Sequence, residues 1–290
     1  MSGSMGKRWW AVLVLPAMML GVPVAMATPA AAAVGTVTVD SDSQPNVGGD
    51  GVETVTAECP ANAALIGAGW STNARVIADE VVPDVTAKTV RVEGWIPDGG
   101  AAFANWSVTA KAICATGVTG AVRAQGVSGY DDSSPKNAVA TCPFGKKVVG
   151  IGYQIGTFAP GQVHVTSVVP TADRVTVTAY EDDNGAADAA GNNVEWDVTA
   201  YAVCATEPFG LERVPSPSPA QGTDHTTCPT GKKVLGAAPS LTSSARDVSI
   251  SSSHISVYAG QEIASAGGVE DRSGATGAWS MSTTAICAFA

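Results

Sequence analysis

The stretch Trp196-Asp-Val-Thr-Ala-Tyr-Ala-Val-Cys204 decides how the rest of the chain is interpreted. It recurs as Trp106-Ser-Val-Thr-Ala-Lys-Ala-Ile-Cys114 and as Trp279-Ser-Met-Ser-Thr-Thr-Ala-Ile-Cys287. In each copy the Cys follows the Trp by eight positions, and apolar residues alternate as they do in a β-strand with one buried face. The three copies predict a β protein built from a repeated unit.

A second motif precedes each copy and extends the repeat. Cys142-Pro-Phe-Gly-Lys-Lys-Val-Val-Gly-Ile-Gly152 matches 228–238, and 59–69 is a looser version. Self-similarity at a near-constant period indicates duplicated units, which we place at 34–116, 117–206 and 207–290. We expect about five strands in each unit. In the first unit these are 35–39, 54–59 with its continuation to 69, 75–82, 89–95 and 106–114.

The composition agrees with many short strands joined by tight turns. Charged residues make up 14% of the chain, and Gly and Pro number 32 and 17. No window has the pattern of a long amphipathic helix. We therefore predict an all-β fold of three homologous antiparallel repeats, each with one disulfide. A closed pseudo-threefold β-prism is favoured over three modules in a row, because closure hides strand edges.

Six cysteines fall at matched positions, two in each repeat. In an exported chain this arrangement predicts disulfides, and the repeat favours pairing within each copy. The expected bridges are Cys59–Cys114, Cys142–Cys204 and Cys228–Cys287. A metal site is the competing interpretation, but the sequence has no Cys-x-x-Cys and no His at a fixed spacing from a Cys. We therefore expect no metal ion and no cofactor.

The N-terminal segment has the pattern of a secretory signal peptide, assigned to residues 1–33. Lys7 and Arg8 precede an apolar run that ends in small residues, and we expect cleavage after Ala27 or after Ala33. A membrane anchor is the alternative, but two prolines interrupt a run barely long enough to span a bilayer. We expect a secreted, extracellular protein with no membrane attachment after cleavage.

The mature chain is acidic. The net charge of the full sequence is −10, and loss of Lys7 and Arg8 with the signal makes it −12. An acidic surface repels phosphate backbones, so nucleic-acid binding is not expected.

Glycines recur on one face of a predicted strand, at Gly67 and Gly69 in the first repeat and at Gly150 and Gly152 in the second. Such positions leave room for a bulky group or for another backbone. We expect the repeated tryptophans to cover this hollow as part of the core, with sugar stacking as the alternative role. These are Trp106, Trp196 and Trp279.

Five other aromatic residues are less regular in position, and we expect them to be partly exposed. A flat ring offers apolar area and a polar edge to a ligand, so a ligand-binding site is sought among them. They are Trp70, Trp95, Tyr153, Tyr180 and Tyr258.

Signals for metal binding or catalysis are weak. The run Glu181-Asp-Asp-Asn-Gly185, together with Asp188, carries oxygen ligands that suit Ca²⁺, but its spacing is not that of an EF-hand, and we interpret it as a hydrated loop. The three histidines occupy non-equivalent places, and no Gly-x-Ser-x-Gly or His-Glu-x-x-His motif occurs. We assign no catalytic residues and expect no enzyme. A pair of carboxylates for glycoside hydrolysis stays open, because their separation is spatial.

The motif Cys-Pro-x-Gly-Lys-Lys-Val-x-Gly-x-Gly, followed by Trp-x-Val-Thr-Ala-Tyr-Ala-x-Cys-Ala, resembles a repeat of proteins secreted by actinobacteria. The resemblance covers nearly all of the mature chain and departs at 62–64, 238–239 and 283–284. It implies export and a repeated β fold, and it brings no catalytic residues. In architecture, three Cys-containing β repeats are also similar to the vitelline membrane outer layer protein, which is a β-prism shared with some plant lectins.

The leading functional expectation is a secreted, non-catalytic binding or cell-surface protein, lectin-like towards extracellular glycans. One alternative is an extracellular hydrolase acting on a polysaccharide or peptide polymer. Another is a structural or inhibitory protein with a protein partner. Three equivalent sites would indicate multivalent binding, whereas one cleft with paired carboxylates of raised pKa would indicate an enzyme. One exposed rigid loop would indicate an inhibitor.

Overall fold

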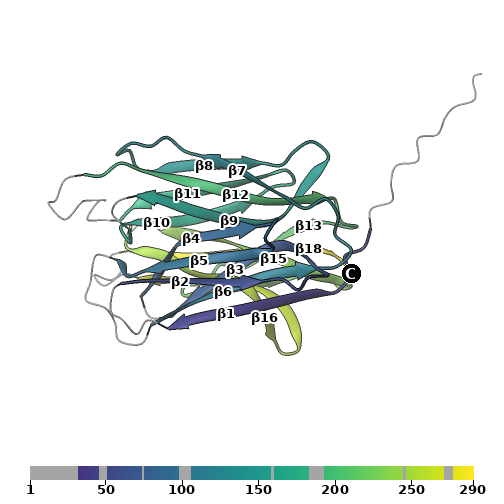
Figure 1. Cartoon of the computed structure of the whole chain (residues 1–290). Helices are drawn as coiled ribbons and strands as arrows, with labels where there is room; N and C mark the ends of the chain where they lie inside the picture. Colours follow the sequence, from purple (N-terminus) through teal and green to yellow (C-terminus); the bar gives the residue numbers. More distant parts are fainter. Residues whose placement is uncertain are drawn as a thin grey trace, which may run out of the picture. The chain divides into compact units, whose positions relative to one another are not determined.

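A computed structural model describes residues 32–45, 51–73, 75–97, 106–157, 160–182, 193–243, 246–270 and 277–290. These residues belong to one compact unit, 31–290. Their regular elements are 18 β-strands in three six-stranded antiparallel sheets, which we call A, B and C (Figure 1). The predicted all-β class is confirmed.

Each sheet has its own order of strands from one edge to the other. Sheet A contains β1 (Val37–Pro45), β6 (Ser107–Ala115), β3 (Ala64–Thr72), β16 (Val248–Tyr258), β17 (Gln261–Glu270) and β14 (Thr223–Thr227). Sheet B contains β2 (Val52–Glu58), β5 (Thr89–Trp95), β4 (Ile77–Asp84), β9 (Lys146–Thr157), β12 (Trp196–Thr206) and β7 (Val122–Val127). Sheet C contains β13 (Glu212–Pro215), β18 (Trp279–Phe289), β15 (Lys232–Ser243), β10 (Val163–Pro170), β11 (Arg174–Glu181) and β8 (Lys136–Thr141).

Every sheet is shared between two repeats. The first, third and sixth strands of a repeat pair in one sheet, and its second, fourth and fifth strands pair in the next. Sheet A thus joins repeats 1 and 3, sheet B joins repeats 1 and 2, and sheet C joins repeats 2 and 3. This cyclic exchange agrees with the predicted pseudo-threefold, prism-like fold.

The exchange corrects one strand prediction. The segment from Thr54 to Gly69 is not one strand continued past the cysteine. It forms β2 in sheet B and β3 in sheet A, separated by a turn in which the Ala63 N–H donates to the Pro60 carbonyl (3.0 Å). Each repeat therefore has six strands, and the cysteine lies where the chain passes from one sheet to the next.

The three sheets meet through their glycines, not through the repeated tryptophans. A Cβ on Gly67 would lie 2.8 Å from the Leu235 carbonyl oxygen, and one on Gly150 would lie 2.3 Å from that of Ile66. The third glycine, Gly236, faces the Val149 carbonyl oxygen. The hollow expected for tryptophan is thus filled by the backbone of a neighbouring sheet, which was the other possibility for these positions.

Bulges produce this meeting of backbones. The ladders between β3 and β6 and between β15 and β18 each shift register at the residue before the glycine, at Ile66 and Leu235. An extra residue in one strand bends it and turns its backbone groups away from the ladder. The bulge carbonyl of one sheet therefore lies against the glycine of the next.

The repeated tryptophans are core residues, as expected. Trp106 and Trp196 are fully buried and Trp279 is 8% exposed, so none of them is a platform for an external sugar. Indole N–H groups of two of them are satisfied by carboxylates at the ends of neighbouring strands. Trp196 Nε1 donates to Glu181 Oε1, and Trp279 Nε1 donates to Glu270 Oε1, each at 2.8 Å.

The three predicted disulfides are present. Cys59–Cys114, Cys142–Cys204 and Cys228–Cys287 have Cα–Cα distances of 5.6, 5.7 and 5.7 Å. Each bridge links the end of a repeat's second strand to its sixth strand, and so connects two sheets.

The first described residues close the unit against its C-terminal strand. Val34 is buried, and its N–H donates to the Phe289 carbonyl (2.8 Å). The Phe209 N–H donates to the Ala32 carbonyl (2.9 Å). Among the described residues, no helix has the length and apolar character needed to cross a membrane.

Candidate functional site

A well-formed hollow with an aromatic residue in its wall lies on sheet C, where the strands of repeats 2 and 3 adjoin. It is a cleft of about 480 Å³. Residues of three strands, together with Arg246, form its wall. The lining residues are His164, Thr166, Ser167, Thr178, Tyr180, Ser240, Leu241, Thr242, Ser243 and Arg246.

The cleft exists because β10 and β15 pair at one position only. Ser167 lies opposite Ser240, and no further pair joins these two strands. Beside that pair, β10 contains a bulge at Thr166, where the ladder with β11 shifts register. The bulge bends β10 locally and prevents a continuous ladder with β15. An opening therefore forms along the boundary between the two repeats.

Hydroxyl groups dominate the lining. Thr166 Oγ1 donates to the Thr178 carbonyl (3.3 Å), which fixes the bulge residue. His164 is buried behind it, whereas Tyr180 is partly exposed and Arg246 is exposed. The wall thus combines short hydroxyl side chains, one aromatic ring and one guanidinium group. The described lining residues include no carboxylate.

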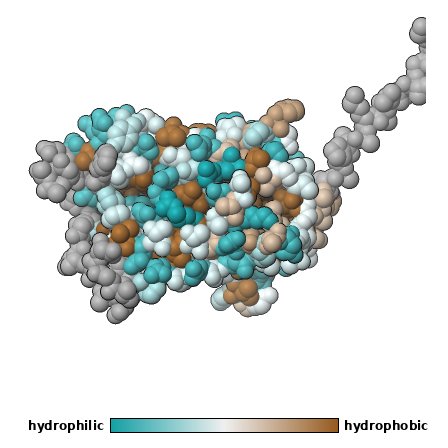
Figure 2. Space-filling view, viewed as in Figure 1, coloured by the Kyte–Doolittle hydropathy of each residue, from teal (hydrophilic) through white to brown (hydrophobic). Residues whose placement is uncertain are grey.

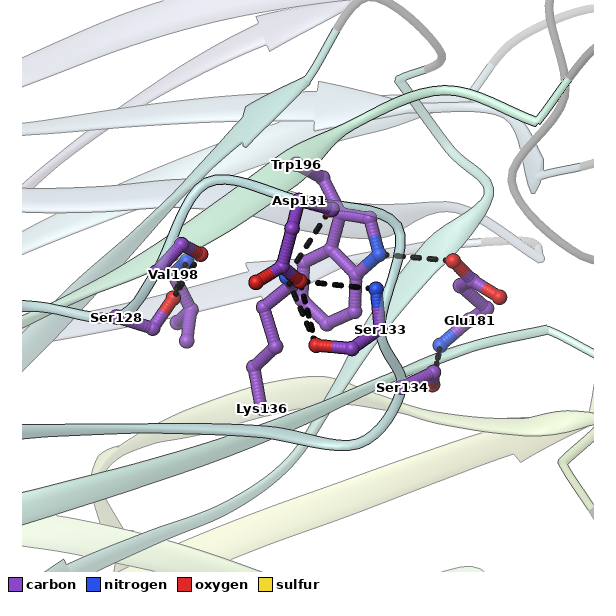
Figure 3. A network of polar contacts seen from close by, with 9 residues as sticks. Ser128, Asp131, Ser133, Ser134, Lys136, Glu181, Trp196 and Val198 are labelled. Carbon is purple, nitrogen blue, oxygen red and sulfur yellow. Dashed lines mark hydrogen bonds and ion pairs between the residues drawn. The ribbon is translucent and has the colours of Figure 1, made fainter.

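A closed polar cluster holds the end of β11, next to Tyr180 (Figure 3). Glu181 accepts the Trp196 indole hydrogen bond, and its backbone N–H donates to Ser134 Oγ (3.0 Å). Lys136 Nζ lies 4.8 Å from the centroid of the Trp196 ring. Because the strand end is tied from both sides, the position of Tyr180 at the rim of the cleft is fixed.

The buried lysine of this cluster is fully paired. The Lys136 side chain is 3% exposed, and its ammonium group forms an ion pair with Asp131 and donates to the Asp131 carbonyl (3.0 Å). Ser133 also donates to the Asp131 carboxylate from its backbone N–H (2.9 Å). Hydrogen bonds from Lys136 and then Ser133 hold the pKa of Asp131 well below its usual range. With its charge neutralised, the cluster is a structural support.

The equivalent boundary on sheet B carries charge where sheet C carries hydroxyls. Glu80 and Glu93 occupy the register positions that Ser167 and Thr178 occupy in sheet C. Arg91 forms ion pairs with both carboxylates, and Gln154 Nε2 donates to Glu80 Oε1 (2.7 Å). Trp95, the counterpart of Tyr180, donates to Glu93 Oε1 (2.8 Å). Hydrophilic side chains gather on this part of the surface (Figure 2).

One carboxyl beneath that network is buried. Asp79 is the bulge residue of β4, is 4% exposed and accepts the Gly161 N–H (3.0 Å). Burial raises the pKa of Asp79 to about 7, against the lowering effect of the Gly161 hydrogen bond and with smaller contributions from the nearby carboxylates of Glu93 and Glu80. Its other oxygen, Oδ1, is buried without a hydrogen-bond partner.

Two of the five predicted ligand residues are not exposed, which corrects that expectation. Trp70 and Tyr153 are fully buried, with ring centroids 5.3 Å apart in an edge-to-face arrangement. Tyr153 donates its hydroxyl to the Ala78 carbonyl (2.8 Å). These rings fill the space between sheets A and B, where their burial leaves no ring face for an external ligand.

The other three predicted residues reach the surface at separate places. Tyr180 lines the cleft, and Trp95 lies within the charged network of sheet B. Tyr258 is 67% exposed at the tip of the β16–β17 hairpin, 5.9 Å from the His225 ring. The five aromatics therefore do not form one site.

Sequence reasoning missed the hydroxyl residues of the cleft. Their signal was the repeat itself, because Ser167 and Thr178 stand where the first repeat has Glu80 and Glu93. Most of the acidic run considered for Ca²⁺, including Asp183 to Gly185 and Asp188, lies outside the described residues. Within the described part of the chain, no group of three or more His, Cys, Asp or Glu residues is placed to hold a metal ion.

Comparison with known proteins identifies no relative: no protein-family model matches the chain, and no curated protein is significantly similar to it.

Proposed function

We propose that the protein is a secreted, non-catalytic binding protein and that the cleft of sheet C holds a sugar unit of an extracellular glycan. The lining of that cleft carries the proposal. Sugars exchange hydrogen bonds with Ser and Thr hydroxyls, and their C–H faces pack on aromatic rings. Tyr180 offers such a ring among the hydroxyls of Thr178 and Ser240, and the guanidinium group of Arg246 adds hydrogen-bond donors.

The size of the cleft and the chemistry of the chain support this proposal. Its volume of about 480 Å³ falls within the roughly 300–1,000 Å³ of small-ligand sites. Three disulfides are typical of extracellular proteins and support secretion, as does the signal-like N-terminal sequence. Glycans are abundant partners in that compartment.

A hydrolytic function has less support. Glycoside hydrolysis needs two carboxyl groups that face the substrate, and the described lining residues of the cleft contribute none. Asp79 and Glu80 both have raised pKa values, chiefly through burial. Asp79, however, is enclosed, and Glu80 is engaged by Arg91 and Gln154. These two groups are therefore not available to a substrate.

One observation favours a second candidate function, the binding of another protein. The β16–β17 hairpin extends beyond the neighbouring strands (Figure 1), and its tip carries Val257, 71% exposed, next to Tyr258. Exposed apolar and aromatic side chains on a tight hairpin are suited to insertion into a partner's groove. An exposed hairpin of this kind supports the alternative of an inhibitory protein, for which one exposed loop was expected.

A glycan array probed with the secreted protein tests the proposed glycan site when two aromatic variants are compared. Tyr180→Ala removes the ring of the cleft, and Tyr258→Ala removes the ring of the hairpin. We expect binding to selected glycans that Tyr180→Ala weakens by about tenfold and Tyr258→Ala leaves unchanged. Loss of binding in Tyr258→Ala alone would move the glycan site to the hairpin. No binding to any glycan would remove the proposal.

A further inference from the structure

A row of uncharged polar side chains crosses the outer face of sheet C and passes through the cleft. Thr178 on β11 and Ser240 on β15 lie opposite Ser167 on β10, one on each side of it. The row continues in the same register to Asn137 on β8 and Ser282 on β18. Residues directly opposite one another in antiparallel strands share a face, and all five are exposed or partly exposed. The row therefore extends one strand beyond the cleft in each direction.

The hydroxyl groups at the centre of the row are not used by the fold. Within the described part of the chain, no hydrogen bond involves the side chain of Ser167 or Ser240. The Ser240 carbonyl accepts a hydrogen bond from Ser282 Oγ (3.3 Å). At the other end, Thr178 Oγ1 donates to Asn137 Oδ1 (2.7 Å), which orients the Asn137 amide and leaves its N–H donors to the solvent side. These donors and acceptors are available to a ligand that lies along the row.

The equivalent row of sheet B is closed by contacts between its own side chains. Glu80 and Glu93 are the pair at its centre. Thr54 Oγ1 donates to Glu93 (3.1 Å), and Gln154 Nε2 donates to Glu80 (2.7 Å). Arg91 forms ion pairs with both carboxylates. Because these side chains satisfy one another, a ligand on this row would have to break contacts that already exist.

The equivalent row of sheet A has hydroxyl groups but no aromatic ring beside them. Ser252 on β16 and Ser71 on β3 pair at its centre. Gly267 interrupts the row on β17, and Val269 stands where sheet C has Tyr180. Of the three rows in the described structure, that of sheet C is the one that combines unused hydroxyls, a cleft and a ring face.

We propose that the row of sheet C binds an extended, uncharged glycan chain of β-1,4-linked sugar units, with one unit in the cleft against Tyr180. This inference rests on the proposed function and adds that the ligand is the interior of a chain. Five strands span four spacings, or roughly 19 Å, and the repeat of an extended β-1,4-linked chain is close to one spacing. About four units therefore cover the row. An uncharged chain fits because none of the five side chains is charged.

Isothermal titration calorimetry with oligomers of one to six units tests the dependence on chain length. The probes are β-1,4-linked glucose oligomers, β-1,4-linked N-acetylglucosamine oligomers and, as a coiled control, α-1,4-linked glucose oligomers. Each added hydrogen bond between neutral groups is worth roughly two- to tenfold in affinity. We expect one β-linked series to gain at least tenfold from two units to four and then to level off. An equal gain in the α-linked series would overturn the proposal.

Two variants compare the end of the row with a matched position in sheet B. Ser282 pairs with Ser240, and Thr199 on β12 pairs in the same way with Gln154. Ser282→Ala should weaken binding of the four-unit oligomer two- to tenfold and leave that of the two-unit oligomer within twofold. Thr199→Ala should leave both within twofold. Equal effects of the two variants would overturn the proposal.

Tyr180→Ala separates failure of this inference from failure of the proposed function. It should weaken binding of oligomers of every length. Binding that depends on Tyr180 but not on chain length would leave the cleft as a site for one sugar unit and would overturn the extended row. Absence of binding to both β-linked series, with binding to another glycan on the array, would also overturn only the extended row. Absence of binding in both assays would overturn the proposed function as well.

Discussion

The contact between neighbouring sheets at the glycines can be tested with two equivalent substitutions, of which only one should destabilise the protein. Gly150→Ala would place a Cβ 2.3 Å from the Ile66 carbonyl oxygen and 2.5 Å from the Gly67 Cα. Gly236→Ala, at the same position of the next repeat, would place its Cβ 3.5 Å from Ile286 Cδ1 and 3.6 Å from the Val149 carbonyl oxygen. The contacts in Gly150→Ala are too short unless the backbone of Ile66 and Gly67 moves, whereas those in Gly236→Ala are ordinary van der Waals contacts.

The expected magnitudes follow from which atoms must move. In Gly150→Ala both obstacles are backbone atoms of sheet A, so a strand of one sheet must move about 1 Å away from the other. Overpacking typically costs about 1–3 kcal/mol, and we expect at least the upper value here because no flexible side chain can yield. Gly236→Ala should be neutral or stabilise by about 0.4–1 kcal/mol, because alanine restricts the unfolded chain.

Urea unfolding of the oxidised protein, followed by tryptophan fluorescence, measures both free energies. We predict a difference of about 3–4 kcal/mol in the free energy of unfolding between the two variants. In thermal unfolding, about 3 kcal/mol corresponds to a drop in melting temperature of roughly 6–12 °C for a chain of this size. Equal stability of the two variants would refute the proposed packing of the three sheets.

Three further predictions concern charge, crosslinks and processing. Because burial raises the pKa of Asp79 from 3.8 to about 7, the protonated form favours the fold, and stability should fall as pH rises from about 4 to about 7. Asp79→Asn should remove that fall and stabilise the protein by about 4 kcal/mol at pH 8, measured by urea unfolding at several pH values; an unchanged pH slope would contradict this. Replacing both Cys142 and Cys204 by Ala should cost about 4 kcal/mol in the same assay, and a loss below about 1 kcal/mol would show that the bridge adds little. The hydrogen bonds of Ala32 and Val34 favour processing after Ala27, so intact-mass measurement of the secreted protein should give a chain beginning at Thr28, and a chain beginning at Val34 would count against it.

The sequence predicted those features that recur at fixed spacing. Alternation from Trp196 to Cys204 identified the sixth strand of each repeat, and matched cysteines identified the three bridges. The alternation can be recognised within one strand, and the matched cysteines can be recognised by comparing the three repeats. Neither prediction requires that the sheet containing each strand be known.

The sheet to which each strand belongs was harder to predict from the sequence, because it depends on pairing between residues that are far apart in the chain. The segment from Thr54 to Gly69 has no long polar interruption, and yet its two halves enter different sheets at the turn after Cys59. Bulges add to the difficulty, since an extra residue at Ile66 changes which face the following side chains occupy. Alternation therefore cannot be followed across it.

The same limits explain the errors in the candidate site. Trp70 and Tyr153 were expected to be partly exposed because their positions looked irregular, although they occupy equivalent positions at which the third repeat has Pro239. Their burial depends on the neighbouring sheet. The hydroxyls of the cleft are ordinary residues of an outer strand face, and only the single pair between Ser167 and Ser240 makes them converge.

The sharing of each sheet by two repeats is tested most directly by amide–amide NOEs in the intact, deuterated protein. The structure predicts NOEs across all three boundaries, between residues around Val81 and Tyr153, Ser167 and Ser240, and Ser253 and Trp70. Interstrand NOEs confined within 34–116, within 117–206 and within 207–290 would instead show three separate modules and would contradict the fold described above.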